Sequence, residues 1–175
     1  MADYKVVGQR NNQEMKTKKK IDWKRLIILL AIPLLVGGLS SLLTGNDMSS
    51  MYTSIEQPPL SPPSALFPIM WTILYILMGV SSYLVSGPEV PTRKRNVALT
   101  IYGAQLVVNF FWSILFFRMQ LILFSFFWIV LLWILVLIMI LVFGRISKAA
   151  AWLQVPYLIW LTIAAYLNIG IYLLN

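Results

Sequence analysis

Five long apolar runs, separated by short polar segments, dominate the sequence. A helix needs about 20 mostly apolar residues to cross the hydrocarbon core of a bilayer, and each segment in lipid must satisfy its own backbone hydrogen bonds. None of the five runs contains Asp, Glu, Lys or Arg. The pattern therefore predicts an all-α integral membrane protein, a bundle of five transmembrane helices at about residues 26–43, 65–85, 97–117, 121–143 and 149–174.

Composition narrows the chemistry that this bundle can perform. Of the 175 residues, 59% are hydrophobic and 11% are charged, which is more apolar side chain than a soluble domain can cover. The sequence has no cysteine and no histidine, so it lacks thiolate ligands, the commonest metal ligand and the usual proximal ligand of haem. We therefore expect no metal site and no required cofactor. Spans without ionisable residues also argue against proton pumps and ion-coupled carriers.

The basic residues are concentrated before the first apolar run. Eight of the 14 lie within residues 1–25, a polar stretch that we expect to be a disordered tail held near anionic lipid headgroups. Nucleic acid is not expected as a partner. Residues 26–175 are expected to form the membrane domain.

The short loops predict an orientation. Thirteen basic residues lie on the side of the N-terminus and only Arg118 lies on the other side. Because basic loops stay in the cytoplasm, we expect a cytoplasmic N-terminus and an external C-terminus in a cell membrane, taken as bacterial.

The first loop is unusually long and rich in proline. Residues 51–63 include four prolines, which fix φ and lack an amide donor, so the segment should be stiff and extended. It could be a rigid connector or a lid over the outer end of the bundle. The composition leaves both interpretations open.

Two spans carry polar and aromatic residues at helical spacing. Trp71 and Tyr75 share one face of the second span, while Gln105, Asn109 and Ser113 recur every four residues in the third. Unpaired amides in hydrocarbon cost several kcal/mol, so this polar stripe must face inward. It could join helices by hydrogen bonds or provide the polar groups of a lipophilic pocket.

The fifth span shows a similar stripe. Trp160, small Ala164 and Asn168 lie on one face, and Pro156 should bend the helix. Close helix approach is expected at the small residues of the first and second spans, which include Gly37, Gly38 and Gly79.

Three separate spans resemble the translocator protein, or tryptophan-rich sensory protein, family. The resemblance covers about residues 26–175, and its motifs occur in order and at the family's spacing. They are Tyr52…Gln57-Pro58…Pro62-Pro63…Leu66-Phe67…Trp71…Leu74-Tyr75…Met78-Gly79, Asn109…Trp112-Ser113…Phe116-Phe117 and Ala151…Leu153…Pro156-Tyr157…Trp160…Ala164…Leu167-Asn168…Leu174-Asn175.

This resemblance implies a five-helix bundle whose ligand pocket is capped by the first loop. It also implies porphyrins such as protoporphyrin IX as ligands, besides the sterols and benzodiazepine-type drugs associated with the family. Trp71 and Trp160 match tryptophans implicated in light-dependent porphyrin breakdown, so they are the catalytic candidates. The positions that match the family's pocket are Tyr52, Pro62, Phe67, Trp71, Tyr75, Asn109, Ser113, Phe116, Trp160 and Ala164.

The sequence departs from the family pattern at two places near the pocket mouth and in the sterol motif. Met51 stands where the family usually has Trp, and Gln57 where it usually has Lys. The sterol motif is incomplete because no basic residue follows Tyr166 or Tyr172.

The leading hypothesis is a membrane receptor or sensor for porphyrins and other flat lipophilic ligands. The alternatives are a light-dependent porphyrin-degrading enzyme and a carrier of tetrapyrroles or lipids. Expected partners are membrane lipids, the small-molecule ligand and, in a possible homodimer, a second copy of the chain.

Overall fold

The computed structural model describes residues 21–45, 50–51 and 54–175. The predicted basic tail, residues 1–25, lies largely outside this part of the chain. Five helices of the described chain are long and apolar enough to cross a membrane, which confirms the predicted architecture. They are α2 (Trp23–Thr44), α4 (Leu66–Val85), α5 (Thr92–Ser113) continued by the π-helical turn η1 (Ile114–Arg118), α6 (Ile122–Gly144), and α7 (Lys148–Trp152) followed by α8 (Val155–Leu174).

The helices extend beyond the apolar runs because polar residues cap or begin them. The side chain of Asp22 accepts a hydrogen bond from the amide of Arg25, so α2 begins before the apolar run. Ser147 caps α7 in the same way, through the amide of Ala150. The fifth span is divided between α7 and α8 just before Pro156, where the sequence predicted a bend.

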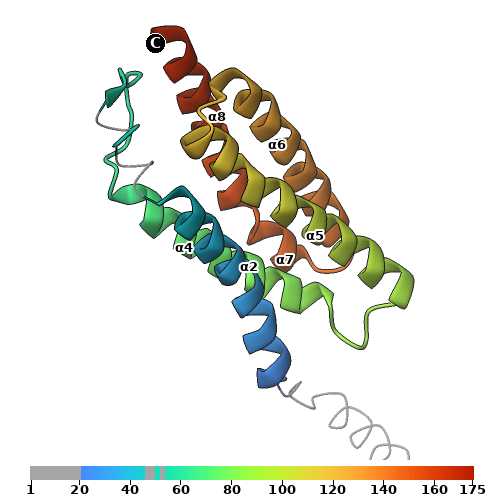
Figure 1. Ribbon diagram of the computed structural model, residues 1–175. Coiled ribbons are helices and arrows are strands. Elements are labelled where there is room, and N and C mark those ends of the chain that lie inside the picture. The colour runs from blue at the N-terminus through green and yellow to red at the C-terminus, as the bar shows by residue number, and fades with distance from the viewer. Residues whose placement is uncertain (1–20, 46–49, 52–53) are drawn as a thin grey trace, which may run out of the picture.

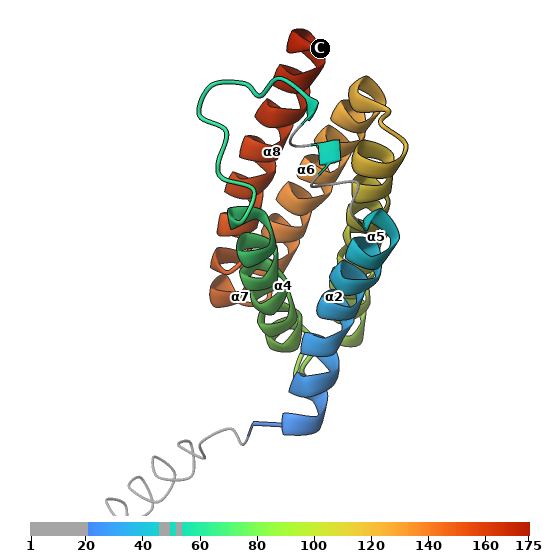
Figure 2. The same cartoon turned by 60° about the vertical axis from the view of Figure 1, so that its left-hand side comes forward.

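The helices form a bundle in which α2 lies along α4 and α6 lies along α8, with α5 packed against both α2 and α6 (Figure 1). The first loop rises beside the C-terminal end of α8 (Figure 2). There the amide of Glu56 donates to the side chain of Asn175 at 3.0 Å. We call this end of the bundle the loop end, and the opposite end, where α2 begins, the tail end.

Glycines bring α2 and α4 together at two of the three expected positions. A Cβ at Gly79 would overlap the backbone of Leu30, and a Cβ at Gly37 would overlap the ring of Tyr75. Gly38 differs, because a Cβ there would meet nothing within 4 Å. The prediction of close approach was therefore wrong for Gly38, beside which α2 borders open space.

One face of α6 supplies much of the apolar core, including the fully buried Leu132 and Met139. A hydrogen bond of 3.0 Å joins Asn168 of α8 to the Ser125 hydroxyl of α6. In addition, the Trp128 indole donates to the Val108 carbonyl of α5 at 2.8 Å. The helix α6 thus holds α5 and α8 at fixed positions, from which their other faces line a cavity.

Candidate ligand-binding site

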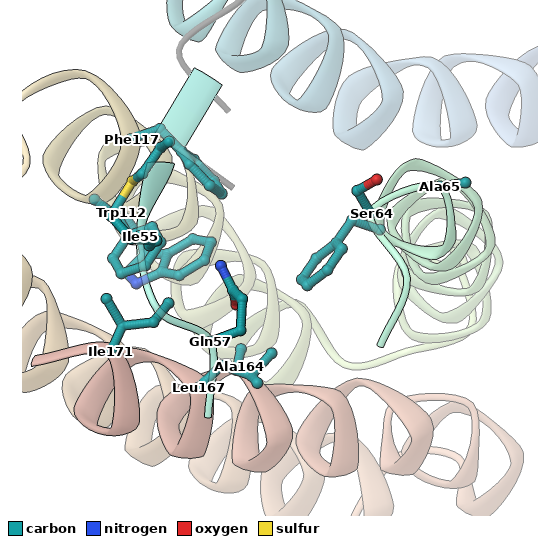
Figure 3. A pocket seen from close by; sticks show the side chains of 12 residues that line it. Ile55, Gln57, Ser64, Ala65, Trp112, Phe117, Ala164, Leu167 and Ile171 are labelled. Carbon is teal, nitrogen blue, oxygen red and sulfur yellow. The ribbon is translucent and has the colours of Figure 1, made fainter. Parts of the chain in front are cut away.

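A cavity of about 220 Å³ lies at the loop end, between the first loop, α4, α5 with η1, and α8 (Figure 3). We call it the central cavity. Its wall is almost wholly apolar. The lining residues are Met51, Ile55, Gln57, Ser64, Ala65, Phe67, Trp112, Phe116, Phe117, Ala164, Leu167 and Ile171.

The first loop covers the central cavity. Met51, Ile55 and Gln57 all line it, and Met51 is buried with only 3% of its surface exposed. Figure 3 shows Gln57 projecting from the loop toward the space between α8 and α4. The lid interpretation of residues 51–63 therefore describes this structure better than a plain connector does.

Aromatic rings from α5 and η1 form one wall. The rings of Trp112 and Phe116 stack with centroids 5.4 Å apart and planes at 12°. Phe117 meets both of them edge-on, at 5.9 and 4.9 Å. These offset and edge-to-face contacts fix the rings by packing. Opposite them on α8, small Ala164 leaves room for a ligand.

A second cavity, of about 320 Å³, lies between α2, α4 and α5. We call it the side cavity. Phe67 and Phe117 line both cavities and so form the partition between them. The other residues lining the side cavity are Leu34, Gly37, Gly38, Ser40, Ser41, Thr44, Pro68, Trp71, Thr72, Tyr75 and Ser113.

A buried hydrogen-bond chain crosses the bundle beneath the cavities. The hydroxyl of Tyr75 donates to Asn109 Oδ1 at 2.9 Å, and Asn109 Nδ2 donates to the Tyr157 hydroxyl at 2.9 Å. That hydroxyl donates in turn to Gln105 Oε1 at 3.2 Å. Both amide groups of the third-span stripe are therefore used to join α4, α5 and α8, as buried polar groups in lipid require.

The ten residues expected from the sequence fall into four groups. Phe67, Phe116 and Ala164 line the central cavity, and Trp71, Tyr75 and Ser113, together with Phe67, line the side cavity. Asn109 and Trp160 are buried next to these cavities but line neither. Pro62 is half-buried in the first loop and also lines neither, and Tyr52 lies outside the described residues.

Trp71 and Trp160 each pack on a neighbouring ring. Trp71 stacks on Tyr75 at 5.6 Å and also contacts the rings of Trp112 and Tyr157. Trp160 meets the ring of Phe67 edge-on at 5.7 Å. Trp160 therefore packs on the wall residue Phe67 from outside both cavities, whereas Trp71 is itself part of the wall of the side cavity.

Sequence reasoning left Trp112 and Tyr157 out of the site. Trp112 lines the central cavity, and its buried Nε1 has no acceptor among the described residues. Tyr157 is fully buried at the centre of the hydrogen-bond chain. Helical spacing was the available signal, because Trp112 is one turn from Asn109 and from Phe116, and Tyr157 is one turn from Trp160.

The described residues contain no group of three or more His, Cys, Asp or Glu side chains that could hold a metal ion. What the site offers is ring surface and a small number of hydroxyls, and the buried Nε1 atoms of Trp112 and Trp160 have no acceptor among the described residues. This is the character of a site that binds a lipophilic molecule.

The TspO/MBR family model matches residues 29–174, from within α2 to the end of α8. The chain belongs to the TspO/MBR family. The resemblance seen in the sequence motifs is thereby confirmed, and with it the assignment as an integral membrane protein.

Relatives in this family come from distant organisms. The TspO/MBR chain is 41% identical over 150 residues to the tryptophan-rich protein TspO of Chlorobaculum tepidum, covering 86% of this chain and 95% of the relative. It is 31% identical over 155 residues to the tryptophan-rich sensory protein of Cereibacter sphaeroides, covering 89% and 94%. It is also 29% identical over 148 residues to the translocator protein of Bos taurus, covering 83% and 87%.

Proposed function

We propose that this TspO/MBR protein is a membrane receptor or sensor that binds porphyrins of the protoporphyrin IX type, and other flat lipophilic ligands, in the central cavity. One observation carries the proposal: the central cavity is apolar and lined by aromatic rings, among them that of Trp112, whose buried Nε1 has no acceptor among the described residues. Leaving a buried donor unpaired costs about 1–3 kcal/mol. A ligand that brings an acceptor recovers this free energy.

The walls suit a flat ligand with a polar edge. Trp112 and Phe116 present stacked rings, and Ala164 on α8 leaves a gap for a plate-shaped molecule. Because Trp112 Nε1 is buried in this structure, we expect the indole ring to turn on binding so that a carboxylate or carbonyl on the ligand edge accepts from it. Met51 and Gln57 at the roof provide no cation, so neutral stacking contributes more than charge attraction to the binding free energy.

A tetrapyrrole needs more room than the resting cavity has. The central cavity of about 220 Å³ lies below the range of roughly 300–1,000 Å³ typical of pockets for drug-sized ligands. Phe67 and Phe117 are half-buried and separate this cavity from the side cavity. We expect these two rings to turn aside when a macrocycle binds.

The test is a titration of intrinsic tryptophan fluorescence with protoporphyrin IX, using protein in liposomes. Ala164→Phe fills the gap on α8, so we expect the dissociation constant to rise at least about tenfold, which is about 1.4 kcal/mol. Ile163→Phe is the matched control, because Ile163 is the preceding residue and lies 38% exposed on the outer face of α8. Its dissociation constant should equal that of the wild type.

Two results would contradict the proposal. In the first, protoporphyrin IX quenches the fluorescence of the wild-type protein no more than it quenches that of free tryptophan. The other is an Ala164→Phe variant that binds as tightly as Ile163→Phe, since the ligand would then lie outside the central cavity.

We also propose that the tail end faces the cytoplasm. The basic residues Arg93, Lys94 and Arg145 all lie at this end, beside the start of α5 and the end of α6, and basic loops stay inside. Since the sequence has no cysteine, single cysteines at Arg145 and Ser64 can be labelled in intact cells with an impermeant maleimide. Labelling at position 145 but not at position 64 would contradict the proposal, because the tail end would then face outside the cell.

A further inference from the structure

The roof of the central cavity is fastened to α8. Besides the bond from the Glu56 amide, Asn175 Nδ2 donates to the Glu56 carbonyl at 3.1 Å. The Tyr166 hydroxyl donates to the Pro59 carbonyl at 2.8 Å. Pro58 is buried against Gly170, where a Cβ would overlap its ring. A ligand that entered through the roof would have to break these contacts together.

On the opposite side of the cavity, the contacts that hold α2 change along the helix. At the tail end, α2 is tied to α4, because the Asp22 amide donates to the Tyr83 hydroxyl at 3.0 Å and Arg25 lies 4.4 Å over the Tyr83 ring. Toward the loop end the two helices separate (Figure 2), and the side cavity lies between them and α5. There α2 is held to α5 and η1 instead, by Ser40 and Arg118.

Apart from Leu34, the α2 wall of the side cavity is built from small residues. Gly37, Gly38 and Ser41 all line it, and Gly38 and Ser41 are exposed. A Cβ at Gly38 would meet nothing within 4 Å, so the backbone of α2 borders open space at this point. In a membrane-spanning bundle, exposed space beside α2 faces lipid.

The side cavity also contains more polar groups than the central cavity. Thr72 and Ser113 contribute hydroxyls from α4 and α5, and Ser41 contributes one from α2. The rings of Phe67 and Phe117 line both cavities, so they lie between this space and the central cavity. A flat molecule with a polar edge could therefore pass through without losing all contact with polar groups.

We propose that the side cavity is a lateral entrance, through which lipophilic ligands dissolved in the bilayer pass between α2 and α4 into the central cavity. Phe67 and Phe117 form the gate. This inference rests on the proposed function, because it assumes that the central cavity binds such ligands. In this proposal α2 forms one side of the entrance, and the ligands that enter carry an apolar body and a carboxylate or carbonyl edge.

The position of Gly38 allows the entrance to be blocked by chemical labelling. The chain has no cysteine, so Gly38→Cys places a single thiol at the mouth without a clash. Labelling the purified protein with N-ethylmaleimide then obstructs the mouth after folding is complete. Gly103→Cys is the matched control, because a Cβ at Gly103 in α5 also meets nothing within 4 Å and this residue lines neither cavity.

The measurement is stopped-flow quenching of tryptophan fluorescence by protoporphyrin IX, with labelled and unlabelled protein in liposomes. For Gly38→Cys, labelling should lower both the association and the dissociation rate by about tenfold while the dissociation constant changes little, since an obstructed path slows passage in both directions. Labelling Gly103→Cys should change neither rate.

Unchanged rates in labelled Gly38→Cys would overturn the lateral entrance and leave the roof as the route. A weaker affinity caused only by faster dissociation would also overturn it, because the side cavity would then belong to the resting site. If the wild type shows no binding, both the proposed function and the lateral entrance are wrong. If the wild type binds normally but labelling of Gly38→Cys leaves both rates unchanged, only the lateral entrance is wrong.

Discussion

Helices α2 and α8 look alike in the sequence as long apolar runs, but the bundle uses them differently. The helix α8 buries seven residues, including Tyr157, Trp160 and Asn168, and forms a wall of the central cavity. The helix α2 buries three, Pro33, Ser40 and Thr44. Hydrophobicity places both helices in the bilayer, but it does not favour contact with protein over contact with lipid, because lipid tails are as apolar as the side chains. Specific polar and small residues then decide which helix becomes part of the core.

The largest effect is expected where α2 does pack closely. Gly79→Leu would push a side chain into the backbone of Leu30, and overpacking of this kind costs about 1–3 kcal/mol. We expect the upper end of this range, because backbone cannot move aside as a flexible side chain can. Unfolding in increasing SDS, followed by circular dichroism, measures the change. Gly38→Leu on α2 should unfold like the wild type, and equal losses in the two variants would show that α2 is packed uniformly.

The next effect tests the polar contribution to the packing of α8. Asn109→Leu removes the acceptor of the Tyr75 hydroxyl and the donor to the Tyr157 hydroxyl. Hydrogen bonds within membrane proteins are worth about 0.6–2 kcal/mol each, so we expect a loss of about 2 kcal/mol in the same unfolding assay. Val107→Leu, at an exposed position of α5, is the control. A stability equal to the wild type would mean that the chain of hydroxyls and amides does not hold α8 in place.

These two cases show what the sequence could predict. The hydropathy pattern predicted all five spans. The proline-rich composition of residues 51–63 allowed either a rigid connector or a lid, and the described residues of this loop cover the central cavity. Helical spacing also identified Gln105 and Asn109 as inward-facing. Spacing could not tell that both amides would meet Tyr157, because a period defines a face of one helix but not its neighbour.

The site was predictable in part for the same reason. The family resemblance pointed to Phe67, Phe116 and Ala164, which line the central cavity. Trp112 was missed although it lies one turn from Asn109 and from Phe116, because helical spacing defines a face of α5 but not the cavity that this face meets. The partition between the two cavities likewise depends on rings from helices far apart in the chain.

A smaller effect should separate ligand binding from packing. Trp112→Phe keeps a ring at the cavity wall but removes the buried N–H, which has no acceptor among the described residues. Stability should therefore change little, because loss of the unpaired N–H offsets part of the packing that is lost with the smaller ring. Affinity for protoporphyrin IX should fall about three- to tenfold, since one net hydrogen bond is worth about 0.5–1.5 kcal/mol. Affinity that is unchanged would show that the ligand does not accept from this indole.

The smallest effect, no difference at all, is expected for light-driven breakdown of the ligand. A receptor needs Trp71 and Trp160 as packing surfaces, which Phe largely preserves, whereas a photoenzyme would need their indoles for electron transfer with the excited porphyrin and oxygen. We therefore expect protoporphyrin IX to bleach at one rate under illumination with wild type, with Trp71→Phe/Trp160→Phe and with liposomes alone. The measurement uses saturating protein, so that a change in affinity does not alter the bound fraction. Bleaching that is faster with the wild type, and not faster with the double variant, would establish the photoenzyme. The functional difference would then depend on the two indoles and not on the packing of α2 and α8. Trp71 lines the side cavity, and Trp160 packs on the gate residue Phe67.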